Sequence, residues 1–262
     1  MERIPTGIFG FDELLFGGFV KNTVNAVFGT VGCGKTIFSI QFLLEGLESG
    51  QHGVYASFDL EKDELVRIAK SLGWDLEKYI ENGLLRVGKF YVEDSFVGSD
   101  LVKFVSGRDI RIVVDSFTPL VANVESSRVR NEVNWFFKNL RECGTAVVTI
   151  EEPLVGVADG NVNIPLFLAD SVIYLKNVGY GEVYSRTLRI LKHRMSPHFD
   201  GVFPFSIIEG AGIVVEEKRT EGFDAEVDDL PIPERCKEKL KKLCREGMLK
   251  REELEKIRKR LV

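Results

Sequence analysis

The chain has 262 residues, 44% of them hydrophobic, which is enough for one large α/β domain and a small appendage. Its formal net charge of −5 argues against a protein whose whole surface attracts nucleic acid, and its four cysteines and three histidines lack zinc-site spacing. Because the sequence shows no signal peptide and no apolar run of membrane-spanning length, we expect a cytoplasmic protein without a membrane partner.

The first predicted elements are a turn and a short helix. Pro5 and the glycines around it predict the turn. Residues 11–15 predict the short helix, and Gly17 and Gly18 predict its end.

A glycine-rich stretch at residues 29–36 follows. Its letters, G-T-V-G-C-G-K-T, fit the phosphate-binding pattern G-x-x-x-x-G-K-[ST]. The apolar, β-branched run at residues 23–28 predicts a buried strand before it, and residues 37–44 predict an amphipathic helix that ends near Gly46. Strand, glycine loop and helix in this order favour a nucleotide site over a glycine turn that matches by chance.

The chemistry of this stretch predicts ATP and Mg²⁺ as its ligands. Glycines let backbone N–H groups turn towards the phosphates, and the helix N-terminus adds its positive end. Lys35 would neutralise phosphate oxygens, and the Thr36 hydroxyl would hold Mg²⁺. The residues predicted to bind the nucleotide here are Gly29, Thr30, Val31, Gly32, Cys33, Gly34, Lys35 and Thr36.

Two further predicted strands end in carboxylates. Residues 52–60 predict a strand that ends near Asp59, before a helix at residues 61–72. One interpretation of Asp59 is a cap for that helix. Residues 110–116 predict a buried strand ending in Asp115, which either binds Mg²⁺ through water or caps a helix; the upstream glycine loop favours the metal role.

The remaining elements are predicted from periodicity and turn residues. We expect a short strand at 84–87, irregular chain at 88–100, a weak helical signal at 101–106 and a helix at 129–143. A strand at 145–151 and a loop at 152–165 follow. Two further strands at 167–175 and 182–191, joined through 177–181, precede the segment at 201–207.

Several motifs in this order resemble KaiC domains of the RecA superfamily. They are P-T-G-I-x-G-F-D followed by G-G and the glycine loop, S-F-acid followed by G-W-D-L, and the runs A-D-S-V-I-Y-L, S-R-x-L-x-I-L-K-x-R and G-x-F-P-F-x-I. The resemblance covers residues 3–215. It implies an α/β fold of the RecA-like P-loop NTPase kind, a mostly parallel twisted sheet flanked by helices, in a domain at residues 1–225.

The resemblance also implies where hydrolysis would be catalysed. KaiC domains place two adjacent glutamates after the second strand, and the matching positions are Asp59 and Leu60. Leu60 cannot accept a proton or orient a water, so Asp59 acts alone, Glu61 replaces the missing group, or hydrolysis is slow or absent. Losing such a group commonly costs about 10²–10⁴-fold, roughly 3–5 kcal/mol of barrier.

Three residues near the end of the domain match the family's subunit contacts. Lys192 and Arg194 match a K-x-R pair that, in KaiC-like hexamers, reaches the γ-phosphate of the neighbouring subunit, which implies a homo-oligomer with a hexamer favoured. The alternative is a basic strand end facing solvent. Met195 stands where the family usually has glycine. His198 matches a family histidine near the nucleotide, or is a surface-loop histidine.

Glu151 ends the predicted strand at 145–151, where the superfamily carries a polar residue that senses the γ-phosphate. Phosphate would repel a glutamate unless it binds Mg²⁺ or water.

Composition changes after residue 220. An acidic stretch and Pro231-Ile232-Pro233 precede two short predicted helices, which make a C-terminal helical hairpin at 226–262 that resembles the SHOCT type. We rank three interpretations of this basic segment: first a hairpin docked on the ATPase, then an oligomerisation or protein-partner tail, and last a nucleic-acid tail. The nucleic-acid tail ranks last because glutamates are interleaved with the basic residues and no aromatic residue is available for stacking.

Three functions are compatible with these features. The first is a KaiC-like ATPase with a regulatory role that forms a ring and hydrolyses ATP slowly. The second is an ATP-gated scaffold without turnover, which Leu60 favours. The third is a RecA-like recombination protein. The mixed charges in the segments that follow the predicted strands at 110–116 and 145–151 disfavour it, so we expect no nucleic-acid partner.

Overall fold

The computed structural model describes residues 1–92, 97–152, 160–177 and 186–215, together with residues 227, 234, 237, 238, 240 and 241. By its internal contacts the chain divides into two compact units, Met1–Val215 and Glu216–Val262. The fold described below is that of the first unit. Most of the predicted C-terminal hairpin lies outside the described residues.

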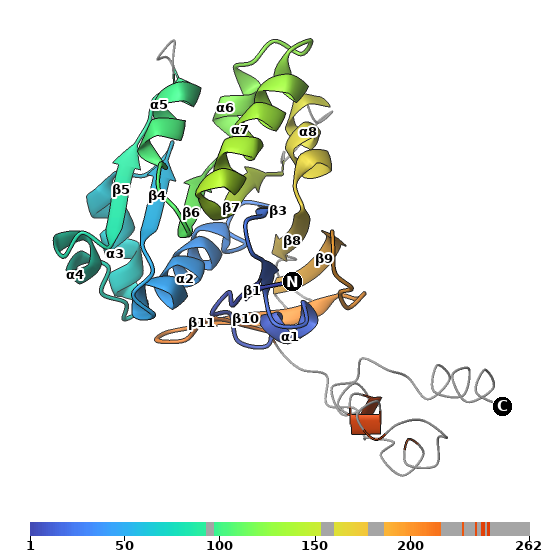
Figure 1. Ribbon diagram of the computed structural model, residues 1–262. Helices are drawn as coiled ribbons and strands as arrows, with labels where there is room; N and C mark the ends of the chain where they lie inside the picture. The colour runs from blue at the N-terminus through green and yellow to red at the C-terminus, as the bar shows by residue number, and fades with distance from the viewer. Residues whose placement is uncertain are drawn as a thin grey trace. The chain divides into compact units, whose positions relative to one another are not determined.

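Within the described residues, nine strands form one sheet in the order β11-β10-β9-β8-β3-β7-β6-β4-β5 (Figure 1). The parallel strands are β3 Val24–Gly29, β4 Gly53–Ser57, β5 Leu85–Lys89, β6 Ile110–Asp115, β7 Gly144–Glu151 and β8 Ser171–Asn177. The antiparallel strands are β9 Arg186–His193, β10 Phe203–Ile208 and β11 Gly212–Val215. This mostly parallel sheet with helices confirms the predicted α/β fold class.

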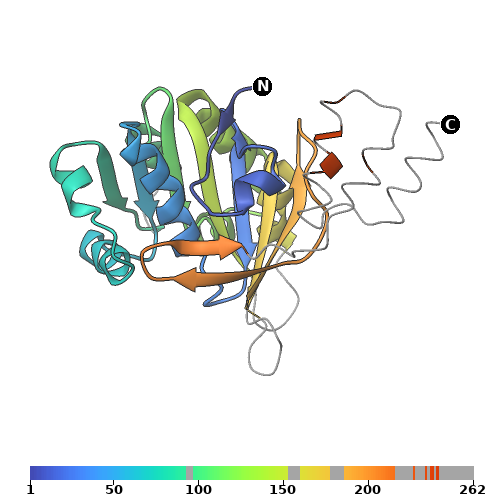
Figure 2. The same ribbon diagram turned by 90° about the horizontal axis from the view of Figure 1, so that it is seen from below.

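Helices lie on both faces of the sheet. They are α1 Phe11–Leu14, α2 Lys35–Glu48, α3 Lys62–Ser71, α4 Glu77–Glu81, α5 Val97–Phe104, α6 Thr118–Ala122, α7 Val129–Cys143 and α8 Gly160–Leu168. Apolar residues at even positions of β3, β4, β6 and β7 pack with α5, α6, α7 and α8 in one core cluster. The opposite face, with the odd positions, contacts α2, and Figure 2 shows the β10–β11 hairpin beside α2.

The N-terminal motif, residues 3–20, contacts both α2 and β11. Two short strands, β1 Arg3–Ile4 and β2 Phe19–Val20, form a separate antiparallel pair. The Asp12 carboxylate accepts the backbone N–H and the hydroxyl of Thr6, and the Gln41 amide donates to the carbonyls of Gly7 and Ala211. These hydrogen bonds hold the N-terminal motif against α2 and the turn before β11.

The helix α2 ends at Glu48, close to the end predicted near Gly46, but Gly46 itself lies inside the helix. A Cβ at Gly46 would lie 2.4 Å from both Cδ and Nε of Arg111. The glycine is needed because the buried Arg111 side chain crosses the helix there and donates to the carbonyls of Pro5 and Phe42, each at 2.7 Å.

The loop predicted at 152–165 is wrong for residues 160–165, and the strand predicted at 167–175 is present but begins later than expected. Residues 160–168 form α8, which contains Pro165, and β8 begins only at Ser171. Val162 of this helix is buried in the core cluster, and α8 packs on α7. Packing therefore outweighs the helix-breaking tendency of Pro165. Residues 153–159 and 178–185 lie outside the described residues.

Other boundaries differ less. The helix expected weakly at 101–106 begins earlier, since α5 starts at Val97. The short helices α4 and α6 and the strands β1, β2 and β11 had no counterpart among the predicted elements. The helix at 129–143 has the predicted bounds. No helix in the described ranges combines the length and apolar character that crossing a bilayer requires.

Candidate nucleotide site

The glycine loop connects β3 to α2 at the carboxyl edge of the sheet. Gly32 and Gly34 have positive φ angles of 71° and 105°, which favour glycine. A Cβ at Gly29 would lie 2.0 Å from the carbonyl oxygen of Leu175, so only glycine fits beside β8. The loop has the backbone shape that a phosphate nest needs.

The side chains of the glycine loop differ in their exposure to solvent. Val31 is exposed and Cys33 is buried, and burial raises the pKa of the Cys33 thiol, so this cysteine is a packing residue. The Thr30 hydroxyl accepts the backbone N–H of Asn177 at 3.2 Å. Lys35 Nζ donates to the carbonyls of Gly29 at 2.9 Å and Thr30 at 3.0 Å, which folds its charge over the loop.

Thr36 and Asp115, the two predicted magnesium ligands, are in contact. Thr36 Oγ1 donates to Asp115 Oδ2 at 2.8 Å, and Asp115 is only 7% exposed. Asp115 also accepts the hydroxyls of Tyr55 and Thr149, so three hydroxyl groups bind one carboxylate. The alternative interpretation of Asp115 as only a helix cap does not account for these contacts.

Tyr55 and Thr149 were not predicted as site residues. Burial, and then the charge of Asp115, raise the pKa of Tyr55 well above its usual value, so its hydroxyl stays a donor. Register could have identified both: Ser57 of β4 pairs with Asp115, and Tyr55 is two residues earlier on the same face. Thr149 lies level with Asp115 on β7.

Asp59 lies two residues beyond β4 and close to Asp115. Burial, followed by the negative charge of Asp115, raises the pKa of Asp59, while Lys89 and the backbone N–H of Ser116 oppose this shift. The alternative role of Asp59 as a helix cap is wrong, because Glu61 is the N-cap residue of α3 and its backbone N–H donates to Glu64 at 2.9 Å.

Glu61, the alternative to the group missing at Leu60, makes its side-chain contacts at the end of β5. Its carboxylate lies 3.3 Å from Lys89 Nζ and accepts the Tyr91 hydroxyl at 3.2 Å. Both partners belong to β5 or the residues directly after it.

Glu151 lies on the same edge as the glycine loop. It pairs in register with Gly29, and its backbone N–H donates to Thr118 Oγ1 at 2.9 Å. Burial and then Asp59 raise the pKa of Glu151, and the charge of Lys35 opposes the shift. The structure thus brings together Lys35, Thr36, Asp59, Asp115 and Glu151.

Lys192 and Arg194 lie at the other edge of the sheet. His193 between them pairs with Ser171, and Ser171 pairs with Asn25 near the start of β3, about 13 Å along that strand from Gly29. Lys192 Nζ donates to the carbonyls of Phe167 at 2.9 Å and Ala169, and Arg194 Nη2 donates to Phe167 at 3.2 Å. Burial, and then Arg194, lower the pKa of Lys192 to about 8.

His198 lies at this far edge as well. Its ring packs edge-on against His193, with centroids 6.4 Å apart, and its Nε2 is 3.4 Å from Asp200 Oδ1. The structure therefore does not bring Lys192, Arg194 or His198 to the glycine loop of their own chain.

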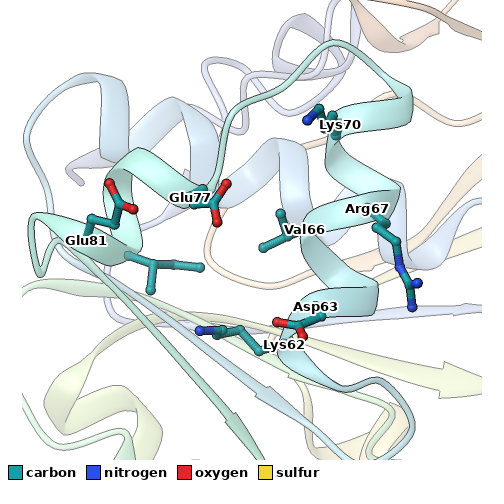
Figure 3. A pocket seen from close by; sticks show the side chains of 8 residues that line it. Lys62, Asp63, Val66, Arg67, Lys70, Glu77 and Glu81 are labelled. Atoms are coloured by element: carbon teal, nitrogen blue, oxygen red, sulfur yellow. The ribbon is translucent and has the colours of Figure 1, made fainter.

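A separate hollow of about 430 Å³ lies between α3 and α4 (Figure 3). It is lined by Lys62, Asp63, Val66, Arg67, Lys70, Glu77, Ile80 and Glu81. None of these is a predicted site residue, and the mixture of both charges with two apolar side chains selects no class of ligand.

The residues at the glycine loop fit a nucleoside triphosphate and its magnesium ion. In the described part of the chain no three His, Cys, Asp or Glu residues are grouped to hold a metal by themselves. A hydroxyl and one carboxylate, Thr36 and Asp115, suit a magnesium ion that keeps water and phosphate oxygens as its other ligands.

Comparison with known proteins agrees with this site. A family model described as "ATPase: KaiC" matches residues 4–220. The circadian clock protein KaiC3 of Synechocystis sp. is 30% identical over 270 residues, which cover 95% of this chain and 52% of the relative. The circadian clock oscillator protein KaiC of Synechococcus elongatus is 32% identical over 229 residues, covering 80% and 43%.

KaiC2 of Synechocystis sp. is 32% identical over 233 residues, which cover 81% of this chain and 40% of that protein. The chain thus spans about half the length of the curated relatives it matches. The matched family, the glycine loop and the Asp115 cluster agree on an ATP-binding ATPase domain. The chain belongs to the KaiC family of ATPases.

Proposed function

We propose that this chain is a regulatory ATPase that binds MgATP at residues 29–36 and hydrolyses it slowly in a homo-oligomeric ring, with a hexamer favoured. In the ring, Lys192 and Arg194 of one subunit reach the γ-phosphate held by its neighbour. The observation that supports this most directly is their position, since both lie at the sheet edge opposite the glycine loop of their own chain. A head-to-tail ring brings such opposite edges together at every interface.

The residues of one chain would divide the work as follows. Backbone N–H groups of the loop and the N-terminus of α2 hold the phosphates, and Lys35 neutralises their oxygens. Thr36 and Asp115 hold the magnesium ion, which stabilises charge on the phosphates when bound. Asp59 orients the attacking water. His198 would approach the neighbour's nucleotide from the same edge as Arg194.

Lys192 and Arg194 have to change partners for this role. In the single chain their side chains donate to carbonyls at the carboxyl end of α8. Burial and the adjacent Arg194 make the charge of Lys192 less favourable there. A neighbouring triphosphate would stabilise both charges, which links nucleotide binding to assembly.

The second candidate is an ATP-gated scaffold that assembles but does not turn over. Leu60 favours it, because the chain has one carboxylate fewer than the family pattern in the segment after β4. In either case we propose that the protein is cytoplasmic and that its C-terminal segment, residues 226–262, forms a second domain that contacts a protein partner.

The two candidates differ in one measurement. Light scattering after size exclusion, with and without ATP and Mg²⁺, reports assembly, and phosphate release is measured on the same sample. We expect an ATP-dependent ring with slow release, and loss of both in Lys35→Ala. Assembly without release would select the scaffold, and a chain that stays monomeric with MgATP would contradict both.

A further inference from the structure

Two carboxylates flank the end of β6, one from each neighbouring strand. Asp115 is level with Ser57 on β4, and the pairing of Val114 with Val148 makes it level with Thr149 on β7. Asp59 and Glu151 each lie two residues further along, on either side of the point where β6 ends. They therefore bracket the space directly beyond Asp115.

Strand alternation places Glu151 on the nucleotide face of the sheet. Thr149 and Glu151 are two residues apart in β7, so their side chains share a face, and Thr149 contacts Asp115 on that face. The next residue, Glu152, faces the other way, where its carboxylate accepts the Tyr174 hydroxyl at 2.9 Å. The two adjacent glutamates therefore have separate surroundings.

Three charged groups act on Glu151, each from a different element. They are Lys35 at the start of α2, Asp59 after β4, and Asp115 at the end of β6. After burial, the charge of Asp59 raises the pKa of Glu151 most, so Glu151 binds a proton more readily than an isolated glutamate. Its backbone is fixed at both sides, by Thr118 and by the carbonyl of Gly29, which accepts the Glu152 N–H at 3.0 Å.

We propose that Glu151 supplies the second carboxylate for ATP hydrolysis, in place of the side chain that Leu60 cannot provide. This inference rests on the proposed hydrolysis. The water oxygen bonds to the γ-phosphorus, the bond from that phosphorus to the bridging oxygen breaks, and ADP leaves with the electron pair. The proton of the water passes to Glu151, while Asp59 holds the water in line.

The test compares the two adjacent glutamates. We expect Glu151→Gln to lower kcat by about 10²-fold or more, because a neutral amide cannot take the proton, with the calorimetric Kd for MgATP changed by less than about threefold. Glu152→Gln keeps an acceptor for Tyr174 and should keep kcat within about twofold of wild type. Thermal unfolding without nucleotide shows that each variant is folded.

A second-site variant separates a chemical role from a structural one. Adding Leu60→Glu to Glu151→Gln restores a carboxylate from the segment after β4, and we expect it to raise kcat at least about tenfold over Glu151→Gln alone. A Glu151→Gln protein with unchanged or higher kcat, or a double variant without recovery, would overturn the assignment. A wild-type ring that releases no phosphate would contradict the proposed hydrolysis itself. An active wild type whose Glu151→Gln variant is equally active would contradict only the role of Glu151.

Discussion

At the scale of single residues, the most constrained group in the site is the Asp115 carboxylate. It is buried and accepts three hydroxyls, from Thr36, Tyr55 and Thr149. Buried carboxylates need such donors, because an unsatisfied acceptor keeps the full cost of its lost hydration. The hydroxyl cluster therefore keeps the Asp115 carboxylate hydrogen-bonded and oriented before any ligand arrives.

Tyr55→Phe removes one of these donors without changing the shape of the ring. We expect it to lower the free energy of unfolding by about 1–3 kcal/mol, because Asp115 loses a partner that no water replaces in a fully buried site. Urea unfolding without nucleotide and Mg²⁺ measures this. The control is Tyr79→Phe, whose hydroxyl makes no hydrogen bond within the described ranges, and equal stability of the two variants would contradict the prediction.

His193 predicts a pH dependence of stability. Its Nδ1 lies 2.7 Å from Ser171 Oγ and its Nε2 3.1 Å from Arg3, so a cation occupies one side of the ring. Burial, and then Arg3, lower its pKa to about 4 from 6.5. The unfolded chain binds the proton more tightly between these values, so stability rises as pH increases from about 4 to 6.5.

We expect wild type to lose about 2–3 kcal/mol more than His193→Gln between pH 7 and pH 4.5, since glutamine keeps both hydrogen bonds and has no proton to gain. Urea unfolding at the two pH values measures the difference. Parallel pH profiles of wild type and variant would show that His193 is not held neutral by its surroundings.

At the scale of elements, α2 shows why a glycine inside a helix is not always a terminator. The Arg111 guanidinium passes against Gly46, stacks on Phe42 at 4.8 Å and donates to Gln51 at 2.9 Å. It thereby joins α2 to β6 and, through Pro5, to the N-terminal motif.

Gly46→Ala should destabilise the protein by about 1–3 kcal/mol, because the new Cβ would displace Arg111 from a packed site. Gly98→Ala in α5 is the matched control, because a Cβ at Gly98 would meet only the Trp135 ring, at 3.9 Å. We expect this variant to be neutral or stabilising. Urea unfolding of both proteins gives the comparison. Equal effects at the two glycines would contradict the argument.

The sequence predicted the elements that carry their own local signal. The strand, loop and helix around residues 29–36 and the carboxylates Asp59 and Asp115 were found because glycines, periodicity and strand ends are visible in one segment. The helix α8 and the role of Gly46 were missed because each depends on a distant partner, the core around Val162 and the Arg111 side chain. Tyr55 and Thr149 became visible only through strand register.

At the scale of the whole molecule, the sheet separates the two halves of the proposed catalytic site. The parallel strands end at the glycine loop, whereas the antiparallel β9 runs back and carries Lys192 to the opposite edge. A single chain of this topology has both halves but cannot join them. Its activity should therefore depend on which edges meet between subunits.

Mixing two inactive variants tests this dependence. One variant carries Asp59→Asn with Glu151→Gln at the glycine-loop edge, and the other carries Arg194→Ala at the far edge. In mixed rings a loop edge from the second variant meets an intact Arg194 from the first at some interfaces. Random mixing at equal amounts should therefore restore about a quarter of the wild-type rate of phosphate release. The control is a mixture of either variant with Asp59→Asn/Glu151→Gln/Arg194→Ala, which keeps Lys35 for assembly but has neither edge intact. If the mixture released no more phosphate than its separate components, Arg194 would act within its own chain or not at all.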